Sequence, residues 1–174
     1  YLALGGAEAS GISVRVWELE NDNTLVALPG CNFEHGSVVK SVSWHPSGNY
    51  LGVVGGNGDG KFNARILEFK DNSLLELEKC RLDTKKNINC IAWSHDGEFI
   101  AGCGTTIAGG DEIRIYRFLE DVQEIGFIPN CGFNHGGVLY GVDWNHDDSR
   151  VVVCGDRGTG GYTVRAFDFS GTNS

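Results

Sequence analysis

The sequence predicts an all-β protein built from tandem copies of one antiparallel sheet, and three observations lead to that prediction. Four arginines in apolar surroundings recur at spacings of 50, 49 and 51 residues: Arg15, Arg65, Arg114 and Arg165. Each of them follows a glycine by ten residues, and Trp44, Trp93 and Trp144 recur at spacings of 49 and 51. No segment shows a 3.6-residue apolar period over three turns, so essentially no helix is expected. A period near 50 residues is typical of repeat architectures.

Each copy contains short apolar or alternating runs that are separated by turn residues. The run at residues 12–19, ISVRVWEL, alternates with a period of two, and Pro29-Gly30 is expected to end the strand before it. The predicted strands are residues 1–5, 12–19 and 24–28; 38–44, 50–54, 63–69 and 74–78; 88–93, 99–103, 112–118 and 124–128; 139–144, 151–154 and 162–169. The first and last copies therefore have three strands, and the two copies between them have four.

The strand before each tryptophan predicts how the sheets pack. Two residues before the tryptophan stand Val42, Ile91 and Val142, whereas mostly small residues occupy the alternate positions. Because successive side chains point to opposite faces of a strand, one face is large and apolar and the other admits a neighbouring sheet closely. We therefore expect sheets that bury both faces against their neighbours.

Composition limits the class of protein and of partner. The chain has 174 residues, of which 41% are hydrophobic and 21% charged, as in an ordinary globular protein. Its 26 glycines fall in clusters between apolar runs and indicate turns. A formal charge of -9 argues against binding nucleic acid or an anionic membrane, and it favours a partner with a basic face. No apolar run approaches 18 residues and no signal peptide is evident, so a cytoplasmic location is expected.

The six cysteines are interpreted through the repeat. Cys103 and Cys154 share a column with Leu4 and Val54, which predicts that they are small core residues in a reducing compartment. A secreted disulfide framework is the less favoured alternative.

The order of these features resembles the WD-repeat β-propeller family over the whole chain. His35 and His135 each stand nine residues before a tryptophan, which matches the family's spacing at the start of a blade, and Trp17-Glu18 is similar to its Trp-Asp dipeptide. The resemblance implies an all-β fold of β-propeller blades, each of four antiparallel strands, in an incomplete ring of about three and a half blades. It implies a partial blade at 1–30, blades at 35–79 and 85–128, and a partial blade at 135–170. The first lacks its inner strand and the last its outer strand.

One departure from the family concerns the buried hydrogen bonds. Four residues before the column arginine the family commonly has a buried aspartate, but this chain has Gly11, Lys61, Gly110 and Gly161. The family's usual network of histidine, serine, tryptophan and aspartate is therefore not expected here.

Several motifs were weighed as sites of metal or nucleotide chemistry. Cys31 and His35 have copies at Cys131 and His135, 100 residues apart, and four such ligands suit zinc. They fall two blades apart, however, so duplication of a loop is the favoured interpretation and no metal is expected. The glycine-rich segments 55–60 and 155–161 lead into strands rather than into a helix that would meet a phosphate. No cofactor is expected, and the acidic residues lack the spacing of a calcium loop.

Catalysis has no support from the sequence. Ser47 and Ser94 are turn residues, and His45, His95 and His146 stand at or beside turns and are expected to be exposed. The alternative function kept open is a propeller-type hydrolase or lactonase whose axial metal site missing blades would complete.

The favoured function is a non-catalytic scaffold that binds a protein or peptide on its loop-rich face. In the family, the loops entering the first strand and those between the second and third strands share one face; here these are 29–37, 80–87, 129–137 and four glycine-rich connections. Phe33 and Phe133 are either aromatic anchors for the partner or rings that pack inward to hold the loop. The other predicted contact residues are Glu34, Asp59, Lys61 and Arg157. Because an arc would expose sheet edges, we expect the chain to be part of a larger chain or complex, or copies to close a ring.

Overall fold

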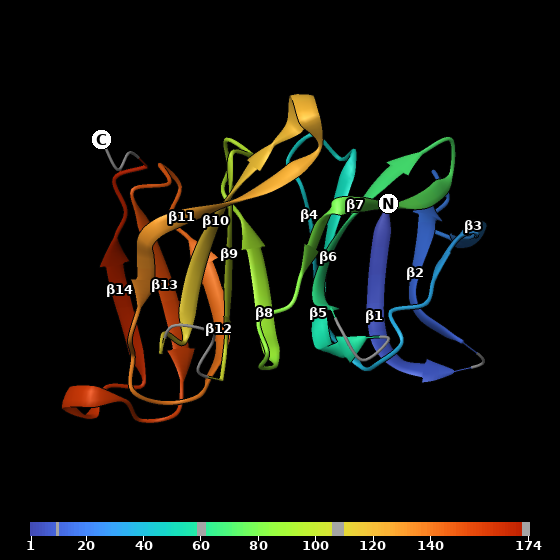
Figure 1. Cartoon of the computed structure of the whole chain (residues 1–174). Coiled ribbons are helices and arrows are strands. Elements are labelled where there is room, and N and C mark those ends of the chain that lie inside the picture. The colour runs from blue at the N-terminus through green and yellow to red at the C-terminus, as the bar shows by residue number, and fades with distance from the viewer. Residues whose placement is uncertain (10, 59–61, 106–109, 172–174) are drawn as a thin grey trace.

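The computed structural model describes residues 1–9, 11–58, 62–105 and 110–171, and it consists of four antiparallel sheets (Figure 1). The first sheet contains β1 (Leu2–Ala9), β2 (Ile12–Leu19) and β3 (Leu25–Phe33). The second contains β4 (Val39–Trp44), β5 (Tyr50–Gly58), β6 (Phe62–Lys70) and β7 (Ser73–Leu82). The third contains β8 (Ile88–Trp93), β9 (Phe99–Gly104), β10 (Ile113–Leu119) and β11 (Glu124–Phe133). The fourth contains β12 (Leu139–Trp144), β13 (Arg150–Gly155) and β14 (Val164–Asp168).

The all-β prediction is confirmed, and the sheets follow one another as blades of an open arc (Figure 1). The inner strands β4, β8 and β12 contact one another in succession, while β1 packs on β4 as β5 packs on β8. By this equivalence, the first sheet has no counterpart of β4 and the fourth has no counterpart of β7 among the described residues. Two single turns of 3-10 helix, η1 (Glu120–Val122) and η2 (Thr159–Gly161), are the helical segments of the described chain.

The core lies between the sheets rather than within one of them. One apolar cluster fills each of the three spaces between adjacent sheets, with Leu51, Ile100 and Val151 among their buried members. The sheets approach closely where the sequence has small residues: a Cβ atom on Gly52 would lie 3.1 Å from Ile91 Cδ1 of the next sheet. Indole hydrogen bonds add direction, since Trp93 Nε1 and Trp144 Nε1 each donate, at 3.1 Å, to a backbone oxygen of the preceding sheet.

The outer strands are longer than predicted and contain a wide bulge. Trp17 pairs with Ala27 but Arg15 pairs with Asn32, so five positions of β3 span two positions of β2. The same irregularity occurs in β7 and β11, each time opposite the column arginine. The expectation that Pro29-Gly30 ends the strand is therefore wrong: both residues lie in the bulge, where a proline needs no partner for its missing N–H.

The loops on the predicted binding face are correspondingly shorter. Because the outer strands run to Phe33, Leu82 and Phe133, the connections to the next inner strands are residues 34–38, 83–87 and 134–138. Strand β5 likewise continues through Gly58, beyond the predicted end at residue 54. No helix of the described chain is long and apolar enough to cross a membrane.

The expectation that His45 is exposed is wrong. It is 6% exposed, and its ring packs edge-on against Trp93 of the next sheet at 4.8 Å between centroids and against Tyr50 at 5.5 Å. Its Nε2 atom donates to Gly97 O at 3.1 Å. The turn residue Ser94 is also fully buried, because its hydroxyl bonds to Phe99 across the turn.

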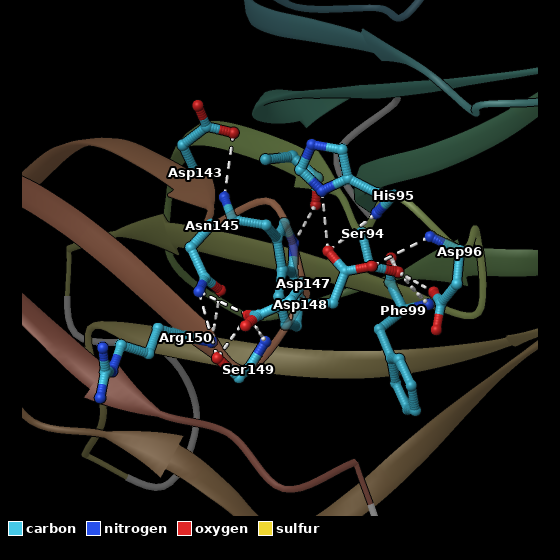
Figure 2. Close-up of polar contacts among 12 residues, drawn as sticks. Ser94, His95, Asp96, Phe99, Asp143, Asn145, Asp147, Asp148, Ser149 and Arg150 are labelled. Atoms are coloured by element: carbon cyan, nitrogen blue, oxygen red, sulfur yellow. Dashed lines mark hydrogen bonds and ion pairs between the residues drawn. The ribbon is translucent and has the colours of Figure 1, made fainter.

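The equivalent turns of the third and fourth sheets are joined by Asp148 (Figure 2). Its carboxylate accepts hydrogen bonds from the backbone N–H groups of His95 and Asp96, at 2.9 and 3.0 Å, and from His95 Nδ1 at 2.9 Å. His95 itself is exposed, as predicted, whereas the Asp148 side chain is only 14% exposed. The turn of one sheet therefore caps the turn of its neighbour.

The cysteines follow the predicted columns only where a neighbouring sheet covers them. Cys103 is fully buried, whereas Cys154 is exposed, contrary to prediction, because no sheet packs on that face of the fourth sheet in the described chain. All six thiols are free. Burial raises the pKa of the Cys80 thiol to about 12, with the charge of Glu124 adding to the effect, so this cysteine is held as an unreactive core residue.

Candidate functional site

A repeated polar framework supports the loops that enter the inner strands. A polar side chain two residues before each column arginine accepts a hydrogen bond from the backbone of the following loop. Ser13 Oγ accepts from His35 N at 2.8 Å, Asn63 Oδ1 from Thr84 N at 3.1 Å, and Glu112 Oε2 from His135 N at 2.8 Å. Since all six residues are buried, each loop is fixed to the sheet before it.

Two histidine rings connect these loops to the glycine-rich connections. His35 Nε2 lies 3.0 Å from Gly56 O, and His135 Nε2 lies 2.9 Å from Asp156 O. A carbonyl oxygen only accepts, so Nε2 of each ring is the donor. The recurring glycine allows this contact: a Cβ atom on Gly55 would lie 2.0 Å from Val38 O. Both kinds of loop therefore meet on one face, which is the lower edge of the arc in Figure 1.

Arg65 completes the network beneath the second blade. It is 2% exposed, and its Nη1 atom donates to His35 Nδ1 at 2.6 Å and to His35 O at 2.7 Å. Its Nε atom forms an ion pair with Glu76 Oε1 at 2.7 Å, and Arg81 Nη2 pairs with the other oxygen of Glu76 at 2.7 Å. The guanidinium also lies 5.9 Å from the centroids of the Phe33 and Phe62 rings. This set of contacts takes the place of the family's aspartate-centred network.

The other column arginines have different partners. Arg114 pairs with Asp111 at 2.8 Å and lies 4.9 Å from the Phe127 ring, and its blade has Thr84 where others have histidine. Arg165 is half-buried, lies 4.9 Å from the Phe167 ring and donates to Asn134 O at 3.3 Å. In that blade the Nδ1 atom of the fully buried His135 has no hydrogen-bond partner.

The predicted contact residues take different positions. Phe33 and Phe133 are half-buried and pack against the core clusters, and the Phe133 and Phe167 ring centroids are 4.8 Å apart. Both rings therefore pack inward, as in the second of the two predicted alternatives. Glu34 and Arg157 are exposed on the loop-bearing face, while Asp59 and Lys61 lie outside the described residues.

Sequence reasoning missed the exposed aromatic and apolar side chains on this face. Tyr140, Tyr162 and Val38 are 58%, 61% and 48% exposed. The Tyr140 hydroxyl donates to Asp156 Oδ2 at 3.3 Å, which places the ring beside the β13–β14 connection. Its column could have revealed it, since the equivalent positions are the polar residues Lys40 and Asn89, which pair with each other at 2.7 Å.

The predicted absence of a metal site is not contradicted by the geometry of its candidate ligands. Cys31 lies in the core between the first two sheets, where burial raises the pKa of its thiol. His35 uses both ring nitrogens within the protein. Among the described residues, no group of three or more histidine, cysteine, aspartate or glutamate side chains could hold a metal ion.

Residues 29–62 and 78–112 each match the family model described as WD domain, G-beta repeat (WD40). The chain contains two WD40 repeats. Each begins in an outer strand, β3 or β7, and continues through the inner and second strands of the next sheet. A WD40 repeat is thus offset from the sheet, and each one includes the loop that holds His35 or Thr84. The predicted family is confirmed by these repeats.

Solved structures support the same fold. The chain is similar to the crystal structure of a protein from Lactobacillus plantarum, with a TM-score of 0.63 and 17% identity over 84% of this chain and 42% of that one. It is also similar to a functionally unknown protein from Desulfotomaculum acetoxidans, with a TM-score of 0.64 and 15% identity over 95% of this chain and 53% of that one. The chain spans about half the length of these two structures, and no curated protein matches its sequence.

Proposed function

We propose that the chain is a non-catalytic WD40 scaffold that binds a protein or peptide partner on the face formed by the loops entering the inner strands. The observation that carries the proposal is the exposure of Tyr140, Tyr162 and Val38 above a buried polar framework. Large amphipathic side chains held on a rigid surface are typical of interaction hot spots, because little conformational entropy is lost when they bind.

The rigidity of this face comes from the contacts beneath it. The backbone at His135 is held by Glu112, and the His135 ring is held by the backbone of Asp156, next to the residue that Tyr140 contacts. A partner that covers Tyr140 therefore meets a loop whose buried hydrogen bonds are already formed. Such preorganisation favours affinity, because the loop need not be ordered on binding.

Polar groups around the tyrosines supply specificity for a polypeptide. Lys40 lies on the inner strand beside Asn89, and Glu34, Asp156 and Arg157 are exposed on the surrounding loops. Charges of both signs suit the mixed backbone and side-chain polarity of a peptide. The net charge of -9 further favours a partner whose remaining surface is basic.

A second hollow, of about 470 Å³, lies on the opposite face and is lined by Asp96, Glu98, Glu120 and Asp121 together with Arg117. Arg117 already pairs with Glu98 at 3.0 Å. We place the partner on the loop-bearing face because exposed aromatic anchors gather there, and the side chains lining the opposite hollow are mainly carboxylates.

The proposal is tested by selecting binders from a displayed library of random peptides against the whole chain. Binders are then measured against Tyr140→Ala, with Val122→Ala as control, since Val122 is 53% exposed in η1 away from this face. Loss of a hot-spot tyrosine costs about 2 kcal/mol or more, so roughly 30-fold weaker binding is expected for Tyr140→Ala and no change for Val122→Ala. Binders that are indifferent to Tyr140 and lost with Val122→Ala would contradict the proposed face.

A further inference from the structure

We propose that the open edge of β14 is an acceptor site for an extended peptide strand that carries a leucine-sized apolar residue and, two positions later, a carboxylate. This site is separate from the loop-bearing face of the proposed function. Three observations, on the sheet edge, on a buried histidine and on a cavity, point to the same missing strand.

The first observation is the edge itself. The first three sheets end on β3, β7 and β11, but the fourth ends on β14, which pairs only with β13 among the described residues. Phe169 N donates to Ser149 O at 2.7 Å, so by alternation the N–H of Ala166 points away from β13, toward the open side. A strand with free donors and acceptors along one side is a template for β-strand addition.

The second observation is the buried Nδ1 atom of His135. In the second blade the equivalent atom of His35 accepts from Arg65, which Glu76 of the outer strand holds in place. In the fourth blade the equivalent Arg165 is present, but it reaches only Asn134 O, and His135 Nδ1 is left without a partner. A buried unsatisfied polar atom costs about 1–3 kcal/mol. A carboxylate on an added strand would place Arg165 as Glu76 places Arg65.

The third observation is a cavity of about 160 Å³ beside β14, between the third and fourth sheets. Its lining includes Cys131, Phe133 and Phe169, the copies of Cys31, Phe33 and Phe69. Between the first and second sheets the corresponding space is occupied by Leu74 of β7, which is 9% exposed and pairs with Phe69. The cavity is therefore shaped for one apolar side chain of that size.

The second blade also defines the register of the incoming strand. Leu74 pairs with Phe69 and Glu76 pairs with Leu67, and the two residues lie on the same face of β7 because they are two positions apart. Transferred to β14, the apolar residue stands opposite Phe169 and the carboxylate opposite Phe167. The acceptor thus reads a short pattern: apolar residue, any residue, acidic residue.

A second copy of the chain is a poorer occupant than a free peptide strand. In a folded copy, Leu74 and Glu76 already pack into their own sheet, so β7 could offer only its outer edge. Such pairing would leave the cavity at Cys131 and the Nδ1 atom of His135 as they are. A free strand satisfies both, and for this reason we assign the site to one.

The test uses the whole chain and a synthetic peptide with the sequence of residues 70–82, in which Cys80 is replaced by serine. Binding is followed by calorimetry and by backbone amide exchange. Saturable binding is expected, with slower exchange at residues 164–168 and a shift of the His135 Nδ1 resonance. Leu74→Ala and Glu76→Gln peptides are each expected to bind about tenfold more weakly, equivalent to about 1.4 kcal/mol. A scrambled peptide is expected not to bind.

The contact with Arg165 is tested by a double-mutant cycle. In an Arg165→Gln chain, the peptide's Glu76→Gln change is expected to lose its effect, whereas an Arg15→Gln chain, altered in the same column of the first sheet, should keep it. The inference is overturned by absence of binding at millimolar peptide, by equal binding of the scrambled peptide, or by a dimer whose β14 edge is protected without peptide. Binding that persists in Tyr140→Ala separates this site from the proposed function.

Discussion

Among single residues, Arg65 and Glu76 show how this chain stabilises charge inside a β-structure. The guanidinium has contacts with a histidine, a backbone oxygen, a carboxylate and two aromatic rings, and these come from four different segments of the chain. A buried charge is tolerated only when such partners surround it. The same residue type at position 15 is exposed, so the column shares an amino acid without sharing an environment.

This difference predicts unequal effects of one substitution in the two blades. Arg65→Met leaves Glu76 and the His35 ring without their donor, so we expect a loss of about 2–4 kcal/mol in the free energy of unfolding. Arg15→Met is expected to change it by less than about 0.5 kcal/mol. Urea denaturation followed by tryptophan fluorescence measures both, and equal midpoints for the two variants would show that the Arg65 network contributes no stability.

Asp148 predicts a dependence of stability on pH. Burial raises the pKa of its carboxyl, but the hydrogen bonds from His95 and Asp96 outweigh burial and lower it below its usual value. A carboxyl whose pKa is lower in the folded state stabilises the fold above its unfolded pKa of about 3.9, and this contribution is lost as the pH falls through the folded pKa. Acidification below about pH 4 should therefore weaken the contact between the third and fourth sheets.

Asp148→Asn tests this dependence, because asparagine also tolerates the left-handed backbone found here, at a φ of 56°. We expect a loss of about 1–3 kcal/mol at pH 7 that shrinks toward zero as the pH approaches 2. Asp121→Asn, at an exposed position, serves as the control. A constant difference between Asp148→Asn and the parent chain from pH 7 to pH 2 would exclude the titration of Asp148 as the cause.

At the scale of strands and turns, equivalent turns have the same backbone but different neighbours. Gly48 and Gly97 occupy matching positions with φ of 76° and 78°, and Asp148 takes the third such position. A Cβ atom on Gly48 would meet nothing within 4 Å, whereas one on Gly97 would lie 2.3 Å from His45 Nε2. The turn of the third sheet is thus the one on which the preceding sheet packs.

Alanine at these two glycines should separate backbone strain from packing. Gly48→Ala is expected to cost about 1–2 kcal/mol for the left-handed conformation alone. Gly97→Ala adds about 1–3 kcal/mol, because the aromatic neighbours hold the His45 ring in place. The difference should disappear in a His45→Ala background; if it persists there, contact with His45 is not its cause. Thermal unfolding of the four chains gives the comparison.

For the whole molecule, the arc has two ends that a closed ring would cover. At the N-terminal end, Leu2 and Leu4 of β1 are 41% and 51% exposed; at the other end, Tyr162 and Val164 are 61% and 58% exposed. Apolar side chains on an open sheet edge favour association with another surface. The net charge of -9 opposes contact between copies, and added salt screens that repulsion.

We therefore expect the chain to self-associate in a manner that depends on concentration and increases with salt. Leu4→Lys should reduce this association, because a charge blocks the edge at β1. Leu75→Lys should leave it unchanged, since Leu75 is equally exposed at 55% but lies on β7 within the arc. Light scattering after size-exclusion chromatography measures the mass, and a strictly monomeric parent chain at high salt would contradict the expectation.

The sequence by itself determined the repeat, the all-β class, the positions of nearly all the strands and the resemblance to WD40 repeats. These follow from local patterns: alternation within a strand, turn residues between strands, and columns that recur about every 50 residues. It also indicated the loop-bearing face, but its candidate residues came from loop composition. Two of them, Phe33 and Phe133, pack inward, and Tyr140 was missed.

Only the tertiary structure decided which members of a column are buried and what they contact. His45 is buried because Trp93 and Gly97 of the next sheet cover it, and Cys154 is exposed because no sheet lies against it in the described chain. The pairing of Arg65 with His35 and Glu76 joins three separate segments. Side-chain environment depends on neighbours that are distant in sequence, and the repeat pattern, which is local, does not contain that information.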